Sequence, residues 1–464
     1  MKNYNNSFGI NNIERLKNKV FSGETLSINW RIQQLKKIDH ILDNYRIEII
    51  NSLSCDLGKS KVEALAEILL VKEEIYLTKN NLRAWMKPKN INTPFYLFPS
   101  SSKVVYEPLG CVLILGPYNY PLLYILKPLV NIFSAGNTAV IKPSEKCSKT
   151  SKLIKKVTSE YFQDDILITI EGDYKVAEKL MNQKFDHIFF TGGTKTGKSI
   201  MKSAAKNLIP VTLELSGSNP VIILKNANIK VAARRIVWGK FFNSGQSCVA
   251  PNHIFVENKI ANQLTEEIKN SITKFYGSNP IESNNLSKLE KKQFTRTLEL
   301  LKKYKANKKI IFGGIYDKKQ FKITPTLINV KSNKDYLLNS EIFSSLLPIL
   351  SIESYKTALD IIAKNPKPLA IYIFGGNSND HKKLTEMTSS GSVCINDVML
   401  PVLIPNLPFG GVGQSGMGKF HGKEGFKNFS NQKSITYKSN LLDIKLRYPP
   451  YDRVLKFIEI FLKI

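Results

Sequence analysis

Four short apolar runs alternate with helical segments between residues 109 and 193, and this alternation constrains the fold more than any other feature of the chain. The runs are GCVLILGP, NTAVIKPS, DILITIEG and FDHIFFTGG, at residues 110–117, 137–144, 165–172 and 185–193. The segments between them carry apolar residues three and four positions apart, as amphipathic helices do. Strands that alternate with helices at this spacing predict a parallel sheet with crossover helices, and therefore an α/β fold.

The rest of the chain divides into further segments. Residues 10–90 have helical periodicity, and residues 91–107 carry the Pro, Ser and aromatic residues of an irregular or hairpin segment. A second alternation of strand-like and helical stretches begins near residue 210 and leads into a Gly-rich loop at residues 405–426. Because 464 residues exceed the size at which a single core keeps growing, we expect two or more packed domains.

The stretch GGTKTGKS at residues 192–199 matches the phosphate-loop pattern G-x-x-x-x-G-K-S of nucleoside triphosphatases. A phosphate loop follows the first strand of its domain and is joined by an acidic residue at the end of another strand, which binds magnesium. Here the pattern follows the fourth strand, and the nearest acidic residue on a strand is Glu214, inside VTLELSG. A P-loop NTPase or kinase is therefore an alternative that the position of the motif disfavours.

Charge and cysteine content narrow the class of protein. The formal net charge is +29, yet the lysines are spread along the whole chain without a basic block, so we expect no nucleic-acid partner. The five cysteines include no C-x-x-C pair, and the five histidines have no metal-ligand spacing, so neither a disulfide framework nor a metal site is expected. No signal peptide and no apolar run long enough to span a bilayer are apparent, which favours a cytoplasmic protein.

Three residues stand where chemistry is plausible. Cys248 in FFNSGQSC follows a Gly-bearing turn between a predicted helix and a predicted strand, a place that suits a nucleophile as well as a buried structural cysteine. Glu214 is a carboxylate on a mostly apolar strand, which is costly unless the group is paired or functional. Asn119 in LILGPYNYP comes just after a strand, at the sheet edge where α/β proteins bind ligands.

Seven motifs then occur in the order of the aldehyde dehydrogenase superfamily, and the chain most resembles its class 3 branch, which includes the fatty aldehyde dehydrogenases. They are GPYNYP, KPSE, FTGGTKTG, LELSGSNP, FFNSGQSC, EIFSSLLPI and PFGGVGQSGMGKFHG, within about residues 10–438. The resemblance implies a Rossmann-like NAD(P)-binding domain at residues 1–90 and 108–213 and an α/β catalytic domain at 214–424. It also implies an oligomerisation hairpin from 91–107 and 425–438, a C-terminal tail helix at 439–464, and a homodimer.

The resemblance also implies a role for each site residue. Cys248 would be the nucleophile, Asn119 an oxyanion donor, and Glu214 the general base that activates water. The residues expected to bind NAD or NADP are Lys142, Glu145, Gly192, Gly193, Gly197, Glu341 and Phe343. Lys142 and Glu145 would reach the adenosine ribose, and Glu341 the nicotinamide ribose. Ser344 and Ser345 follow Phe343 where the family commonly has Gly-Pro.

The expected reaction is oxidation of medium- to long-chain aliphatic aldehydes to carboxylic acids through a cysteine thiohemiacetal and thioester. A dehydrogenase that passes the acyl group to coenzyme A is a further alternative, against which the LELSG glutamate argues. The tail segment VLKFIEIFLKI at residues 454–464 has one wide apolar face. It fits a lid over the substrate entrance, a peripheral membrane contact, or a helix packed on the body of the protein.

Overall fold

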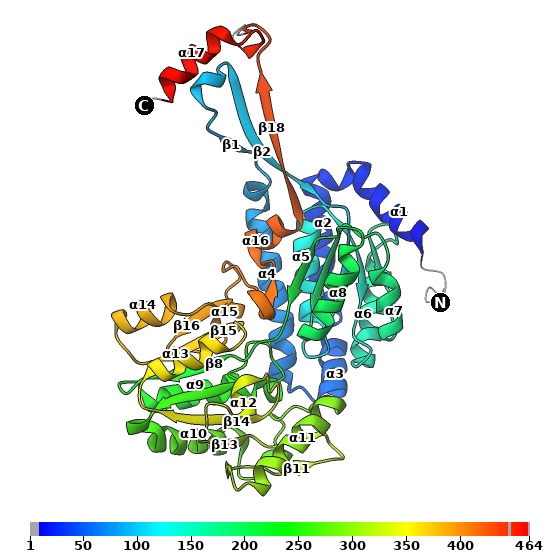
Figure 1. Cartoon of the computed structure of the whole chain (residues 1–464). Helices are drawn as coiled ribbons and strands as arrows, with labels where there is room; N and C mark the ends of the chain where they lie inside the picture. The colour runs from blue at the N-terminus through cyan, green and yellow to red at the C-terminus, as the bar shows by residue number, and fades with distance from the viewer. Residues whose placement is uncertain (1–8, 444–446, 463–464) are drawn as a thin grey trace.

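The computed structural model describes residues 9–443 and 447–462 and consists of two α/β lobes with a narrow sheet projecting from them (Figure 1). The remaining residues of the predicted first segment and tail, 1–8, 444–446 and 463–464, lie outside this description. The four strands predicted between residues 109 and 193 are all present, and the three predicted crossover helices lie between them. The predicted α/β class is therefore confirmed.

The first lobe is built on a six-stranded sheet in the order β17-β7-β6-β3-β4-β5. All neighbours are parallel except β17 and β7, which pair antiparallel through Gly416 and Glu214. The strands are β3 (Cys111–Leu115), β4 (Thr138–Lys142), β5 (Leu167–Thr169), β6 (His187–Thr191), β7 (Val211–Glu214) and β17 (Gly416–Met417). The Gly-rich loop thus returns to the first lobe to supply its edge strand.

Helices cover both faces of this sheet, as a buried parallel sheet requires. Its crossover helices are α5 (Leu123–Ser134), α6 (Ser148–Tyr161), α7 (Tyr174–Met181) and α8 (Thr194–Ala205). The N-terminal helices are α1 (Ile10–Phe21), α2 (Ile28–Asn44), α3 (Arg46–Leu57) and α4 (Lys61–Trp85). Helix α4 packs against α5, and Glu67 of α4 accepts a hydrogen bond from the Leu122 N–H in the loop that follows β3.

The second lobe holds a seven-stranded sheet in the order β10-β13-β14-β9-β8-β15-β16, parallel except for the β10–β13 pair. Its strands are β8 (Pro220–Ile223), β9 (His253–Glu257), β10 (Ile310–Phe312), β13 (Thr326–Val330), β14 (Leu346–Ile352), β15 (Ala370–Phe374) and β16 (Ser392–Ile395). Its helices are α9 (Ile229–Phe241), α10 (Ala261–Tyr276), α11 (Lys291–Ala306), α12 (Tyr336–Asn339), α13 (Tyr355–Lys364), α14 (Ser378–Glu386) and α15 (Leu400–Leu403). Helix α16 (Gly422–Asn428) packs on α4 and α5 of the first lobe. A small ribbon, β11 (Tyr316–Asp317) with β12 (Lys322–Ile323), borders α11.

One buried cluster joins the two lobes, since Val112 of β3 and Val221 of β8 belong to the same apolar core.

Helix α11 was not predicted from the sequence. Its Lys-rich outer face dominates the composition, while Phe294, Leu298 and Leu301 form the stripe that packs inward.

The projecting sheet consists of β1 (Lys89–Ile91), β2 (Ser100–Pro108) and β18 (Ser430–Lys438), with β2 paired antiparallel to both neighbours. Helix α17 (Asp452–Phe461) lies at the far end of this sheet, away from both lobes (Figure 1). Of the three roles that the sequence left open for the tail, packing on the body of this chain is not what the structure shows, because Leu455, Ile458 and Ile460 of α17 are exposed.

Candidate active site

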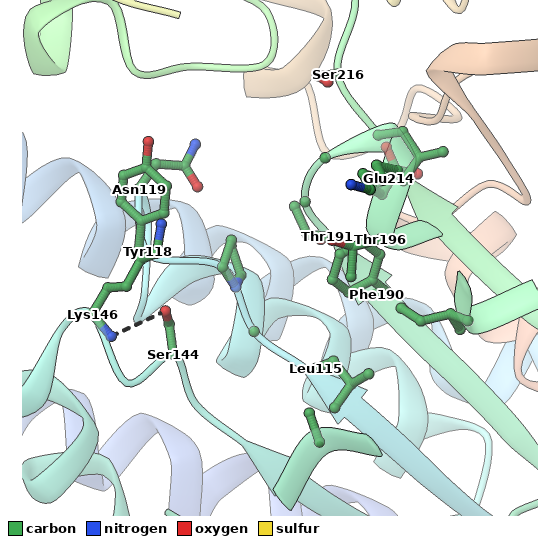
Figure 2. Close-up of a pocket in the computed structure, with 18 of the residues that line it drawn as sticks. Leu115, Tyr118, Asn119, Ser144, Lys146, Phe190, Thr191, Thr196, Glu214 and Ser216 are labelled. Carbon is green, nitrogen blue, oxygen red and sulfur yellow. Dashed lines mark hydrogen bonds between the residues drawn. The ribbon is translucent and has the colours of Figure 1, made fainter. Parts of the chain in front are cut away.

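A cavity of about 580 Å³ opens at the carboxyl ends of β3, β4, β6 and β7, where open parallel sheets bind ligands. The second lobe closes it with the loops that carry Cys248 and Glu341. Figure 2 shows Tyr118 and Asn119 on one side of this space and Glu214 on the other. Nine of the ten predicted site residues line the cavity: Asn119, Lys142, Glu145, Gly192, Gly193, Glu214, Cys248, Glu341 and Phe343.

Gly197 is the exception, because it lies inside α8 and faces the neighbouring strand segment. A Cβ at this position would stand 2.7 Å from Cδ2 of Leu215. The absence of a side chain therefore lets α8 approach the sheet closely, and Gly197 acts in packing rather than as a wall of the cavity.

Cys248 is held by a short loop whose backbone is unusual. After α9, the 3-10 turn η4 (Phe242–Gly245) places Asn243, Ser244 and Gly245 in the left-handed region, with φ of 53°, 53° and 79°. Asparagine and glycine tolerate this region best, which fits the NSG sequence. The loop then brings Cys248 to the cavity with only 6% of its surface exposed.

Asn219, which the sequence analysis did not single out, anchors the far side of this loop. Its side-chain amide donates to the carbonyl oxygens of Cys248 at 2.7 Å and Ala250 at 3.0 Å. Its carbonyl oxygen accepts from the Ala370 N–H at 2.9 Å, which ties the loop to β15. The buried backbone groups of the loop are thereby satisfied without regular secondary structure.

Asn119 lies beside the cysteine loop and is 4% exposed. Its Nδ2 donates to the carbonyl oxygen of Gln246 at 3.0 Å, while its own backbone oxygen accepts from Nδ2 of Asn243 at 2.9 Å. Glu63, at the start of α4, accepts from the Asn243 N–H at 2.6 Å. The amide of Asn119 and the turn before Cys248 are therefore locked to one another and to α4.

Glu214 ends β7 and is 1% exposed. Neither carboxyl oxygen has a hydrogen-bond partner among the described residues, although the group lines the cavity. Burial raises the pKa of Glu214 well above its ordinary range, and the nearby Lys419 ammonium opposes this only in part. A buried carboxyl group left free in this way can exchange a proton with water in the cavity.

The wall formed by residues 192–205 has the geometry of a helix N-terminus. Helix α8 begins at Thr194, directly after Gly193, and no side chain caps it. Its free N–H groups suit a phosphate-containing ligand. The phosphate-loop interpretation is not supported, because Lys198 and Ser199 lie within the helix, and the Lys198 side chain is exposed and is not among the residues lining the cavity.

Lys142 and Glu145 form an ion pair at the edge of the cavity, with Nζ and Oε2 2.6 Å apart. Burial opposes ionisation of Glu145, but the bond from Lys142, a bond from its own backbone N–H and the charges of Lys142 and Lys146 together outweigh burial, so the pKa of this carboxyl lies below its ordinary value. The Glu145 carboxylate is therefore a charged hydrogen-bond acceptor, and the buried Lys142 ammonium beside it is a donor.

Glu341 and Phe343 form the opposite end. Burial raises the pKa of Glu341 to about 7, and its Oε1 has no partner among the described residues. Phe343 adopts a φ of 53° and meets Tyr118 edge-on, with ring centroids 6.2 Å apart. Arg296, missed in the sequence, fixes this loop by donating to the Glu341 carbonyl at 2.6 Å.

These features fit a dinucleotide. The cavity offers an uncapped helix N-terminus, unpaired carboxyl oxygens and, at Gly193, bare backbone with open space beside it that a ligand can approach closely. Among residues 9–443 and 447–462, no group of three or more His, Cys, Asp or Glu side chains could hold a metal ion, and no helix is long and apolar enough to cross a membrane.

Comparison with known proteins agrees with this geometry. The model of the aldehyde dehydrogenase family matches residues 17–435. The 4,4'-diaponeurosporen-aldehyde dehydrogenase of Staphylococcus aureus is 40% identical over 442 residues, covering 95% of this chain and 96% of that protein. The rat protein named "Aldehyde dehydrogenase, dimeric NADP-preferring" is 36% identical over 442 residues, covering 94% and 97%.

Solved structures extend the match to the fold. A structure described as the substrate-bound state of Staphylococcus aureus AldH superposes with a TM-score of 0.94 at 38% identity, covering 98% of this chain and 100% of that one. Other relatives at 36 to 39% identity are named as members of aldehyde dehydrogenase family 3. The chain therefore belongs to the aldehyde dehydrogenase family, oxidoreductases that act on the aldehyde group with NAD or NADP as cofactor.

Proposed function

We propose that this aldehyde dehydrogenase oxidises medium- to long-chain aliphatic aldehydes to carboxylic acids through a thioester on Cys248. One observation carries the proposal: the buried thiol, the Asn119 amide and the unpartnered Glu214 carboxyl group meet at a single cavity. These are the nucleophile, oxyanion donor and base that such an oxidation requires.

In the first half of the reaction, the Cys248 thiolate attacks the aldehyde carbon. Negative charge develops on the carbonyl oxygen, and the Asn119 amide and the Cys248 N–H are its donors. Because Asn119 is fixed by Gln246 and Asn243, its amide is oriented before the substrate arrives. Such preorganised donors stabilise the transition state without reorganisation.

A bound NAD or NADP would supply the acceptor for the hydride that leaves the thiohemiacetal carbon, and a thioester would remain on Cys248. Glu214 then takes a proton from water, and the water oxygen attacks the thioester carbonyl. The acid is released and the thiolate is restored. A raised pKa suits Glu214 for taking up and returning this proton near neutral pH.

The cofactor is held by residues from both lobes. Lys142 and Glu145 would hold the adenosine ribose, the free N–H groups at the start of α8 would bind the phosphates, and Glu341 and Phe343 would hold the nicotinamide end. The charge of Glu145 disfavours a 2′-phosphate, while Lys142 beside it offers a partner for one. Both NAD and NADP are therefore to be tested.

Aromatic side chains lie on the buried side of the Cys248 sulfur. Tyr124 contacts Cys248, Phe420 packs on Tyr124, and Phe409 packs on Phe420. Because these three rings are buried and do not line the cavity, they offer the substrate no surface, and the proposed preference for medium- to long-chain aliphatic aldehydes rests on the family resemblance and on the aldehyde series below.

The projecting sheet is the proposed dimer contact, and α17 is the proposed lid. In one chain α17 lies far from both lobes (Figure 1), so it can cover a substrate entrance only on a second copy. The rat relative is named as dimeric. Light scattering after gel filtration should give the mass of two chains.

Deletion of residues 451–464 should raise the KM for long aldehydes more than for short ones, and equal effects on both would leave anchoring at a membrane instead.

The central experiment follows reduced-cofactor absorbance with aldehydes from acetaldehyde to hexadecanal, each with NAD and NADP. We expect the rate of turnover to rise with the chain length of the aldehyde and to be independent of added coenzyme A. The proposed compartment is the cytoplasm, where the five cysteines stay free. The matched control is Cys248→Ser, which should abolish oxidation and leave cofactor binding intact, because a hydroxyl ionises far less than a thiol. Near-normal turnover of this variant would remove Cys248 from the nucleophile role.

A further inference from the structure

A tyrosine hydroxyl contacts the sulfur of Cys248 directly. The Oη atom of Tyr124 lies 3.5 Å from Sγ of Cys248, and both side chains are buried. Among the described residues, the sulfur is the one hydrogen-bond partner of this hydroxyl. Tyr124 is not among the residues that line the cofactor cavity, so it reaches the sulfur from the interior of the first lobe.

The position of Tyr124 is firmly fixed. Its ring meets Tyr120 edge-on at 6.1 Å and packs on Phe420 at 6.3 Å. The turn that carries it, at the start of α5, is held by buried Glu67, which accepts from the N–H groups of Leu122 at 3.1 Å and Leu123 at 3.0 Å. A hydroxyl anchored in this way loses little freedom when it bonds the sulfur.

The other groups that face the sulfur work against a thiolate. Burial, with a smaller contribution from the carboxyl groups of Glu214 and Glu341, raises the pKa of the Cys248 thiol to about 12. The hydrogen bond from Tyr124 and the Cys248 N–H lower it. Of the three side chains Tyr124, Glu214 and Glu341, Tyr124 is thus the one that stabilises the thiolate form of Cys248.

The direction of the bond follows from the chemistry of the two groups. Burial raises the pKa of Tyr124 well above its ordinary range, so the phenol keeps its proton. A thiolate has no proton and can only accept. When the sulfur is ionised, the tyrosine must therefore be the donor.

We propose that Tyr124 is a further catalytic residue, whose phenolic hydroxyl donates a hydrogen bond to the Cys248 sulfur and stabilises the thiolate that attacks the aldehyde. This rests on the proposed nucleophilic role of Cys248. Once the sulfur is acylated it carries no negative charge, and the bond weakens. Tyr124 therefore acts on attack and on the return of the thiolate as leaving group, and not on the activation of water.

The test is alkylation of the full-length enzyme by iodoacetamide across a pH series, with each modified cysteine identified by peptide mass spectrometry. In this reaction the thiolate forms a C–S bond, iodide leaves, and the thiol proton has passed to solvent. We expect Tyr124→Phe to slow alkylation of Cys248 by about tenfold or more at neutral pH, because hydrogen bonds to charged groups are among the strong ones. Alkylation of exposed Cys55 is the internal reference and should not change.

Tyr120→Phe is the matched control. Its ring is the neighbour of Tyr124, but its hydroxyl approaches Ser247 and makes no hydrogen bond to the sulfur, so its loss should leave the alkylation rate of Cys248 unchanged. Replacement of Tyr124 by 3-fluorotyrosine keeps the shape and makes a stronger donor, and should shift the thiol pKa downward. This second variant also serves if the Phe variant does not fold.

The proposal is overturned if Tyr124→Phe slows alkylation by less than about threefold, if Tyr120→Phe causes the same loss, or if 3-fluorotyrosine does not lower the thiol pKa. Alkylation requires no aldehyde turnover. An enzyme inactive on every aldehyde would therefore refute the proposed function while leaving the hydrogen bond to be judged on its own result.

Discussion

Replacing Gly245 with alanine should disable the site without unfolding the protein. Gly245 adopts a φ of 79°, and a Cβ there would lie 2.3 Å from the Ser344 carbonyl oxygen and 3.0 Å from that of Lys240. Ordinary contact begins at 3.4 Å, so the loops must separate by about 1 Å. Both obstacles are backbone atoms, which cannot rotate away as a side chain can.

The magnitude has two parts. The left-handed conformation costs a non-glycine residue about 1–2 kcal/mol wherever it occurs. The displacement acts on the loops of Cys248 and Phe343, and a misplacement of about 1 Å at a reacting group costs about 100-fold in rate. We therefore expect kcat/KM to fall by about 100-fold, with a melting temperature lowered by only a few degrees.

Gly23→Ala separates the two parts. Gly23 has nearly the same φ, 81°, and is left-handed, yet a Cβ there would meet only Cδ1 of Leu26 at an ordinary 3.8 Å. This variant should lose the same stability and keep its activity. The assay compares initial rates with hexanal and NAD alongside thermal melting of all three proteins. Equal kcat/KM for the two alanine variants would refute the reasoning, since it would mean that the contact with Ser344 does not matter.

Three further changes test other parts of the site. Glu214→Gln should give a burst of about one reduced cofactor per active site and then little turnover, since the thioester forms but is not hydrolysed; steady turnover at the wild-type rate would assign water activation to another group. Lys198→Ala should keep activity and NAD affinity within about twofold, because this side chain is exposed on α8; a large loss of nucleotide affinity would revive the phosphate-loop interpretation. Folding raises the pKa of Glu341 from 4.5 to about 7, because burial disfavours the charged carboxylate. The free energy of unfolding is therefore highest below pH 4.5, where this group is neutral in both states, and falls as pH rises through 7. Glu341→Gln should therefore raise the melting temperature, relative to wild type, more at pH 8 than at pH 5, and an equal difference at both would contradict this sign.

The strands of the first lobe could be predicted because their sequences are almost wholly apolar. Residues Cys111–Leu115 and Thr138–Lys142 are buried along their full length, as the interior of a parallel sheet requires. The two-residue strand β17 could not be predicted, because its pairing with β7 depends on a loop that returns from the second lobe.

The reacting residues could be named, but not what holds them. Glu63 forms a capping box with Ser60, which the sequence S-x-x-E indicates. Its bond to the Asn243 N–H, 180 residues away, has no local signal. Asn219 likewise resembles any loop asparagine until the carbonyls of Cys248 and Ala250 are seen around it. Periodicity reports which face of an element is buried, and it does not report which distant backbone group a polar side chain will meet.

The arm formed by β1, β2 and β18 has a consequence for synthesis. Residues 100–108 pair with residues 430–438, near the opposite end of the chain. While the ribosome is still making the second lobe, the edge of β2 that later pairs with β18 is open. The nascent chain therefore carries an unpaired strand edge, which could pair with another chain, until the partner residues 334 positions further along have emerged.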